Sequence, residues 1–252
     1  MNKDIQNENY DLNFSEFYEL YLTSHAKRAY QKINELLKTE KIYNTKDMNI
    51  IDFMCGTGTL LSYFEKEHLT EGVDISTAML NIAKRNLNST KFTEADVTNY
   101  YSETKYTVAL STADAVNHLP NISSVNKLFK NINKSLKKDG IFIFDMNTRL
   151  GVNRNAFFIS SSDENGLSIR EGFVDDINNI GYTRFQGFFR KNNYDNYKRF
   201  DSIIYNHIYE IDDIEILLKQ NGFIDIKIYD FDNGGSFNSD YTERILVSAK
   251  KQ

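Results

Sequence analysis

The stretch from Asn49 to Leu61, NIIDFMCGTGTLL, constrains the fold of this chain more than any other feature of the sequence. Its apolar half, Ile50 to Met54, is typical of a buried parallel strand. Gly56 and Gly58 then break the strand, and neither carries a Cβ that would keep a ligand away from the main chain. We expect a helix from Thr59 onward, with Thr59 as its cap. A strand, a glycine turn and a helix N-terminus in this order bring backbone N–H groups to a ligand.

Two later segments of the chain also end predicted strands in acids. Residues 71–76 predict a short strand that ends at Asp74, and residues 92–97 predict a third strand end at Asp96. Asp74 follows Asp52 by about 20 residues, which is the place of a carboxylate that binds ribose hydroxyls. We therefore expect Asp52, Asp74 and Asp96 to converge at one edge of a parallel sheet.

In these motifs the chain resembles the class I S-adenosylmethionine-dependent methyltransferases. The matching motifs are DxxCGTG at residues 52–58, GVDIS at 72–76 and ADV at 95–97. The resemblance implies that S-adenosylmethionine is the cofactor and S-adenosylhomocysteine its product. It also implies that Asp52 lies near the methionine amino group, Asp74 on the ribose and Asp96 near the adenine amine. The residues that we expect at the cofactor are Asp52, Cys55, Gly56, Gly58, Asp74, Ile75, Met79, Asp96, Val97, Ser111, Tyr18 and Tyr21.

A nicotinamide cofactor fits the same stretch less well. Its fingerprint needs a third small residue where this chain has Leu61, and it needs no acid at the end of the first strand, where Asp52 stands. Met54 stands where the methyltransferases more often have glycine, which alters the approach of the turn to the cofactor. Protection against thermal unfolding by S-adenosylmethionine but not by NAD would separate the two cofactors.

The N-terminal part of the chain predicts a helix, because apolar side chains recur at helical spacing from Phe14 to Leu37. One interpretation is a helix that only packs on the core. The other is that Tyr18 and Tyr21 cover the cofactor pocket, since methyltransferases of this kind often close the site with an N-terminal helical segment. Their phenol groups would then reach the ligand while the rings exclude water.

The second half of the predicted core supplies the loop beside which an acceptor would lie. Residues 105–111 predict a fourth strand, and the loop after it, up to Leu119, lies where the strand order should reverse. An amphipathic helix and a fifth strand, residues 141–145, follow. With Asn117-His118-Leu119 and FDMNT at residues 144–148, this region looks like the small bacterial methyltransferases that include sugar-amine N,N-dimethyltransferases.

His118 is the candidate general base, because an amine must be neutral to attack a methyl group. The alternative is a solvated loop histidine. Asn117, Asp114 and Asn147 are candidates for orienting the hydroxyls or amines of a substrate, or they cap the loops that they occupy. Cys55 has no evident histidine partner that would make it a nucleophile.

The chain changes character after the fifth strand. Aromatic residues with period-two spacing predict three antiparallel strands, at residues 168–175, 182–191 and 197–209. We interpret them as a lid on the substrate side, with Phe185 at the substrate; the alternatives are a dimer interface or a simple extension of the sheet. Residues 151–167 are polar and predict a mobile access loop. A helix and a closing antiparallel pair of strands complete the chain.

Together these segments predict an α/β fold: a Rossmann-like, seven-stranded, mostly parallel sheet with helices on both faces, plus a small antiparallel β lid inserted after the fifth strand. Residues 1–150 would form the N-terminal helical cap and the cofactor-binding core. Residues 151–210 would form the substrate lid, and residues 211–252 the C-terminal part of the core sheet.

The composition restricts the partners of the chain. Its 30 basic and 35 acidic residues give a net charge of −5, which argues against a grip on nucleic acid or on an anionic membrane. A single cysteine excludes an intramolecular disulfide and a cysteine-built zinc site, and the four histidines lack metal-ligand spacing, so we expect no metal. No apolar run is long enough to span a bilayer and no signal peptide is evident, which favours a cytoplasmic protein.

We therefore expect an enzyme that transfers a methyl group in line to an amine or hydroxyl of a small molecule, such as a sugar or another natural product. A homodimer formed through the lid is a further expectation. Methylation of tRNA or rRNA, and a non-catalytic module that only binds S-adenosylmethionine, remain alternatives. The sequence fixes neither the acceptor nor the number of methyl groups transferred.

Overall fold

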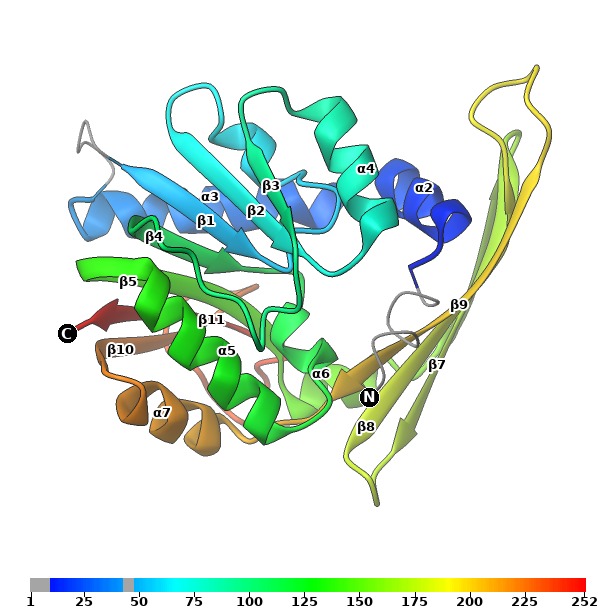
Figure 1. Ribbon diagram of the computed structural model, residues 1–252. Helices are drawn as coiled ribbons and strands as arrows, with labels where there is room; N and C mark the ends of the chain where they lie inside the picture. The colour runs from blue at the N-terminus through cyan, green and yellow to red at the C-terminus, as the bar shows by residue number, and fades with distance from the viewer. Residues whose placement is uncertain (1–9, 43–47) are drawn as a thin grey trace.

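The computed structural model describes residues 10–42 and 48–252 of the chain. Its main sheet has seven strands in the order β10-β11-β5-β4-β1-β2-β3 (Figure 1). Strands β1 to β5 pair in parallel with one another, while β11 is antiparallel to both β5 and β10. The predicted mostly parallel, Rossmann-like sheet is confirmed.

The elements of this core follow one another as strand, crossover and strand. Its strands are β1 (Asn49–Phe53), β2 (Leu69–Asp74), β3 (Lys91–Glu94), β4 (Tyr106–Ser111), β5 (Leu136–Asn147), β10 (Phe223–Asp230) and β11 (Arg244–Lys251). Its helices are α3 (Ser24–Thr39), α4 (Thr77–Asn86), α5 (Ile122–Ser135), α6 (Arg149–Arg154) and α7 (Ile211–Gln220), with short 3₁₀ turns η1 (Leu61–Tyr63) and η2 (Ala115–His118).

Both faces of the main sheet are covered, which is why every residue of β1 is buried. On one face Ile51 and Phe53 belong to a core cluster that includes apolar side chains of α5 and α7. On the other face Ile50 packs in a second cluster with Ile33 and Leu37 of α3. The apolar run of β1 therefore reflects burial on both sides. None of the helices in the described residues is long and apolar enough to cross a membrane.

A second sheet of four antiparallel strands stands beside the core (Figure 1). Its strands are β6 (Phe158–Asp163), β7 (Gly166–Asp175), β8 (Ile180–Phe189) and β9 (Lys198–His207), and we call this sheet the lid. Helix α2 (Leu12–Tyr21) lies between the core and the lid and contacts both α4 and β9. Phe14 and Phe17 of α2 form a small apolar cluster with Phe189 and Phe200 of the lid.

The single helix predicted from Phe14 to Leu37 is wrong, because the chain forms α2 and α3 with a break between them. The apolar side chains of the two halves pack in different places: Phe14 and Phe17 pack on the lid, and Ile33 packs on the sheet. A straight helix could not serve both surfaces. At the break the carbonyl oxygen of Leu22 accepts a hydrogen bond from Nδ1 of His25 at 2.8 Å.

Two further expectations about local structure are wrong. The segment after Thr59 contains only the short turn η1 rather than a helix, and the Thr59 hydroxyl pairs with that of Thr57 instead of capping a backbone N–H. The apolar side chains of this segment, Leu60, Leu61 and Phe64, are buried as expected. The segment is short, however, because β2 begins already at Leu69. Residues 151–167 are not an access loop, since they include the end of α6 and strand β6, which pairs with β7 along its length.

Candidate active site

The glycine turn after β1 leaves open space for a ligand against the main chain. Gly56 has a positive φ of 55°, and a Cβ built there would meet nothing within 4 Å. Gly58 also has a positive φ, but a Cβ there would come within 3.3 Å of Ala83 and Leu87. Gly56 therefore opens the turn to a ligand, whereas Gly58 permits close packing against α4.

Asp52 lies at the inner end of this turn, with only 2% of its surface exposed. Its Oδ1 is buried and has no hydrogen-bond partner within the described residues. Burial raises the pKa of Asp52 to about 8, and the negative charges of Asp74 and Asp145 act in the same direction. The carboxylate lines a narrow cavity together with Gly56 and Tyr18. A buried acceptor without a donor suits an ammonium group, so the residues fit the amino end of S-adenosylmethionine.

Asp74 connects the ends of β1 and β2. Its carboxylate accepts hydrogen bonds from the backbone N–H of Gly56 at 2.8 Å and of Ser76 at 2.9 Å. Burial raises the pKa of Asp74, although these bonds oppose the change. Asp74 lines a second cavity, of about 120 Å³, with six other residues predicted for the cofactor: Tyr18, Gly56, Ile75, Met79, Asp96 and Val97. This cavity has the apolar walls and the acids that an adenosine group requires.

The remaining residues predicted at the cofactor divide into two groups. Cys55 lines the narrow cavity beside Asp52, and Tyr18 lines both cavities. Ser111 and Tyr21 line neither cavity. Ser111 is fully buried in the sheet, and Tyr21 is 40% exposed, with its ring stacked on Phe17 at 5.0 Å between centroids. Of the two tyrosines of α2, only Tyr18 faces the predicted cofactor site.

A third and larger cavity, of about 410 Å³, opens between α2, the loop after β4 and the lid. We call it the acceptor cavity. It shares Tyr10, Tyr18, Ala113 and His118 with the adenosine-sized cavity. Two of the residues predicted for substrate binding, Asn147 and Phe185, line it. The two cavities therefore meet at His118 and at the tyrosines of the N-terminal segment.

His118 stands at this junction between two polar partners. Its Nε2 lies 3.6 Å from Oδ2 of Asp114, and its Nδ1 lies 3.4 Å from the hydroxyl of Tyr10. The ring of Tyr10 also stacks on the imidazole, with 6.4 Å between centroids. The imidazole of His118 is thus held in one orientation. A cavity that can hold a ligand lies on each side of it.

Asn117, the neighbour of His118, forms hydrogen bonds with backbone groups and does not line the acceptor cavity. It is fully buried, its Oδ1 accepts from the N–H of Asn147, and its Nδ2 donates to the carbonyls of Asn147 and His207. Asn147 itself lines the acceptor cavity, and its Nδ2 donates to Oδ1 of Asn206 at 3.2 Å. Asn117 therefore fixes the position of η2 relative to β5 and β9.

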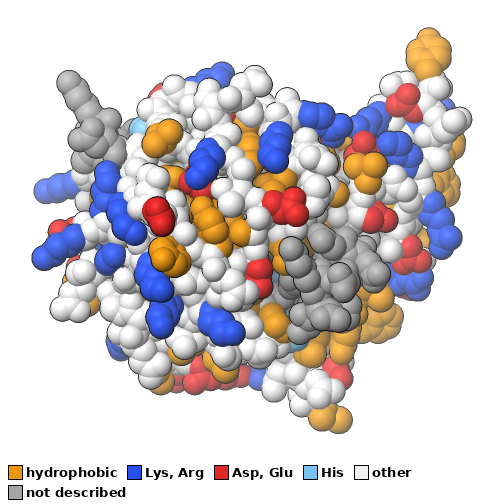
Figure 2. Space-filling view, in the orientation of Figure 1, with side chains coloured by type: hydrophobic (Ala, Val, Ile, Leu, Met, Phe, Trp, Pro, Cys, Tyr) orange, Lys and Arg blue, Asp and Glu red, His pale blue; other side chains and the backbone are white. Residues whose placement is uncertain are grey.

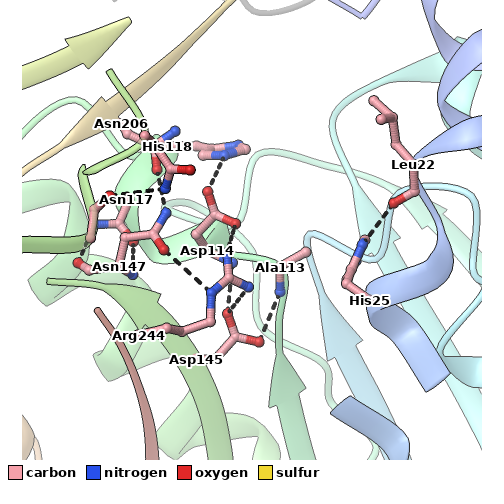
Figure 3. Close-up of polar contacts among 12 residues, drawn as sticks. Leu22, His25, Ala113, Asp114, Asn117, His118, Asp145, Asn147, Asn206 and Arg244 are labelled. Carbon is pink, nitrogen blue, oxygen red and sulfur yellow. Dashed lines mark hydrogen bonds and ion pairs between the residues drawn. The ribbon is translucent and has the colours of Figure 1, made fainter. Parts of the chain in front are cut away.

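The sequence reasoning missed an ionic network beneath His118 (Figure 3). Arg244 donates to Asp114 at 2.7 Å and to Asp145 at 3.1 Å, and its Nε donates to the amide oxygen of Asn147 at 3.3 Å. Asp145 also accepts from the N–H groups of Ala113 and Asp114. Burial alone would raise the pKa of Asp114, but the charge of Arg244 and the contact with His118 hold this pKa well below its ordinary value.

The sequence carried a partial signal for this network. Asp145 belongs to the FDMNT motif at the end of β5, although no role was assigned to it. Arg244 had no signal, because it reaches the site only through the antiparallel pairing of β11 with β5, where Arg244 lies opposite Asn147. A second missed residue, Arg170 of the lid strand β7, also lines the acceptor cavity.

Comparisons with known proteins agree with this geometry. Residues 50–140 match the family model of a methyltransferase domain. A protein of Geobacillus sp. (strain WCH70), provisionally named a methyltransferase, is 28% identical over 218 residues, which cover 80% of this chain and 84% of that protein. An S-adenosylmethionine-dependent methyltransferase from Clostridium acetobutylicum superposes with a TM-score of 0.80 at 24% identity, over 94% of this chain and 97% of the other. A sugar N-methyltransferase from Streptoalloteichus sp. gives a TM-score of 0.76 at 13% identity, over 94% and 92%.

Proposed function

We propose that this chain, whose residues 50–140 match a methyltransferase domain, is an S-adenosylmethionine-dependent enzyme that methylates an amine or hydroxyl of a small molecule. The observation that carries the proposal is the junction of the two cavities at His118 and Tyr18. A cavity of about 410 Å³ has the size of a site for a small ligand. The likeness to a sugar N-methyltransferase supports a sugar or a related natural product as the acceptor.

The residues of the core would hold the cofactor by its polar ends. The cofactor supplies a methyl group on a positively charged sulfur, which makes that carbon electrophilic. Asp52 offers its unpartnered Oδ1 to the amino group, and Asp74 and Asp96 offer carboxylates to the ribose and the adenine amine. The open face of Gly56 lets the main chain lie against the ligand.

The residues of the acceptor cavity would orient the nucleophile and exclude water. His118 accepts a proton from the acceptor amine at Nδ1, where the amine replaces the Tyr10 hydroxyl, because only the neutral amine has a lone pair for attack. Asp114 holds the imidazole in place for this step from the Nε2 side, and the stacked ring of Tyr10 supports it. Tyr18 and Phe14 of α2 line the acceptor cavity, and their rings keep water away from the reacting atoms.

The alternative of an RNA substrate has less support. The net charge of −5 does not favour an electrostatic grip on a polyanion. Binding of bulk RNA with a steep dependence on salt in a filter assay would favour this alternative.

The other alternative is a module that binds S-adenosylmethionine without transferring its methyl group. A single-turnover assay with methyl-labelled cofactor and a panel of amines and hydroxylated metabolites tests the proposal against it. Transfer of label to an amine or hydroxyl supports the proposed function. Tight binding of the cofactor by calorimetry with no transfer to any member of the panel would favour the binding module.

We also propose that residues 151–210 act as a substrate lid and that two copies of the chain associate through it. Several apolar side chains of the lid point to solvent, and Figure 2 shows apolar side chains along its outer edge and at its tip. The most exposed of them are Phe158, Phe173, Ile177 and Tyr194. Sedimentation equilibrium of the protein and of an Ile177→Asp, Phe173→Asp double variant would test the dimer. A monomeric wild-type protein would contradict it.

A further inference from the structure

Arg170 is the one arginine lining the acceptor cavity that has no carboxylate within ion-pair distance among the described residues. The other two arginines of the lining are paired: Arg28 with Asp232, and Arg244 with Asp114 and Asp145. For Arg170 the structure gives a single hydrogen bond to the protein, from Nη2 to Oδ1 of Asn155 at 3.0 Å. Its Nε is buried and has no hydrogen-bond partner. The guanidinium thus enters the cavity with most of its donors unused.

Aromatic rings hold the Arg170 side chain in this position. The guanidinium carbon lies 4.9 Å from the centre of the Phe157 ring and 5.7 Å from that of Phe185. Burial lowers the pKa of Arg170, but an arginine stays charged at any working pH. The charge of Asp114 opposes this lowering from a distance, but no carboxylate of the described residues pairs directly with the guanidinium, so an anion could still complete the site.

The opposite wall of the acceptor cavity has the reverse charge. Asp114 and Asp145 share the single guanidinium of Arg244, which leaves one negative charge beside His118. Burial alone would lower the pKa of Arg244, but the two carboxylates hold it above its ordinary value. The cavity is therefore polarised, with an acidic end at the reaction centre and a basic end on the lid.

We propose that the acceptor carries an anionic group, a carboxylate or a phosphate, which binds the guanidinium of Arg170 while the acceptor amine lies near Asp114 and His118. This inference rests on the proposed function. The planar fork of an arginine matches both anions, because each offers two oxygens to parallel N–H donors. An amine that is cationic in solution would be drawn to the acidic end, and Arg170 would then set which amines enter in the productive orientation.

Calorimetry on the complex with S-adenosylhomocysteine tests this proposal without requiring turnover. The probes are glucosamine, glucosamine 6-phosphate and 2-amino-2-deoxyglucuronic acid, which share the amine and the sugar ring and differ at C6 in carrying no anion, a phosphate or a carboxylate. We expect at least one anionic probe to bind roughly tenfold to hundredfold more tightly than glucosamine. The probe that binds more tightly than glucosamine identifies the anion as a phosphate or a carboxylate.

Variants of two lid arginines assign the effect to Arg170. Arg170→Gln should abolish the preference for the anionic probe, and Arg170→Lys should keep part of it. Arg199→Gln removes the same charge from strand β9 of the lid, where the side chain is 81% exposed, and should leave the preference intact. Thermal unfolding of each variant checks that the lid remains folded.

Two results would overturn the proposal: an anionic preference that survives Arg170→Gln, or the absence of any preference in the wild-type complex. Where all three probes bind too weakly to measure, a crystal soaked in selenate decides, since an anion bound to the Arg170 guanidinium supports the site and its absence refutes it. Failure of the proposed function gives a different pattern. In that case the anionic preference persists, but no methyl group is transferred in the single-turnover assay.

Discussion

The guanidinium of Arg244 lies 2.7 Å from the carboxylate of Asp114, although 130 residues separate them in the chain. Asp114 belongs to the loop after β4 and has a positive φ of 50°, a conformation that is uncommon outside glycine although aspartate adopts it more readily than most residues. Arg244, from the first position of β11, supports Asp114 from the neighbouring strand. The last strand of the sheet therefore fixes the loop that carries His118.

Replacing Arg244 by glutamine should destabilise the protein, because it leaves Asp145, which is 1% exposed, and Asp114 without their cation. We expect a loss of about 3 kcal/mol in the free energy of unfolding, measured by urea denaturation. Arg154→Gln is the matched control. Both side chains of the Arg154–Glu243 ion pair are exposed to solvent, so this pair should contribute less than about 1 kcal/mol. Equal losses in the two variants would contradict a special role for Arg244.

The parts of this molecule that the sequence predicted well depend on residues close together in the chain. The apolar run before Gly56, and the placement of Asp52, Asp74 and Asp96 at the ends of successive strands, are local patterns with a fixed geometric meaning. In a parallel sheet the strand ends meet at one edge, so local patterns placed three acids around one site. Three of the four lid strands, β7, β8 and β9, were found for the same reason, by their alternation, whereas β6 was missed.

The parts that the sequence did not predict depend on contacts between distant segments. Arg170 and Arg244 are ordinary arginines in strand-like surroundings, and only the docking of the lid and the pairing of β11 with β5 bring them to the acceptor cavity. The break between α2 and α3 was missed for a related reason. Helical spacing reports that a side chain is buried, but it does not say against which partner it is buried.

The affinity for the cofactor should depend on pH through Asp52. The pKa of this carboxyl is about 8 in the folded protein without ligand, against an ordinary value of 3.8. Since the folded form holds the proton more tightly than the unfolded chain does, Asp52 lowers the free energy of unfolding progressively from about pH 4 to about pH 8. Its carboxylate must be free of the proton to accept from an ammonium group, so affinity should rise with pH up to about pH 8.

Calorimetry with S-adenosylhomocysteine at several pH values tests this expectation. Asp52→Asn should bind roughly tenfold more weakly than the wild-type protein near pH 8 and should lose the rise with pH. Its free energy of unfolding without ligand should exceed that of the wild-type protein near neutral pH. A wild-type affinity that falls between pH 6 and about pH 8 would exclude this role for Asp52.

Replacing Asp74 by alanine should weaken binding of S-adenosylhomocysteine by about 2–3 kcal/mol, because the variant loses charged acceptors for the ribose hydroxyls. The same carboxylate accepts from the N–H groups of Gly56 and Ser76, so part of the loss comes from a looser turn. Asp96→Ala should cost less, since Asp96 is more exposed and its carboxylate already accepts from Thr98 and Asn99. Native-like affinity in Asp74→Ala would refute the ribose assignment.

Replacing His118 by alanine should lower kcat by roughly 10²–10⁴ while leaving the affinity for the cofactor within a few-fold of the wild-type value. The reason is that His118 acts on the acceptor proton and lies at the edge of the adenosine-sized cavity, not at its polar ends. His68→Ala is the control, because His68 lines none of the three cavities. Unchanged turnover in His118→Ala would remove this residue from the mechanism.

Glu16 should control how firmly the lid docks on α2. Its carboxylate is buried against Lys191 and Lys198 of the lid segment. Burial alone would raise the pKa of Glu16, but the two lysines lower it below the ordinary value of 4.5. The stabilisation is therefore complete above about pH 4.5 and is lost as the pH falls through the lowered pKa.

The chain offers a matched control for this prediction in Glu40, whose side chain is 8% exposed and also pairs with two lysines, Lys227 and Lys250, but lies away from the lid. Glu16→Gln should speed amide hydrogen exchange in β8 and β9 and raise KM for the acceptor, because the lid then opens more often. Glu40→Gln should cost a similar amount of global stability without changing exchange in the lid. If the two variants gave the same pattern of exchange, the lysine pair around Glu16 would be a general contribution to stability and would not control the lid.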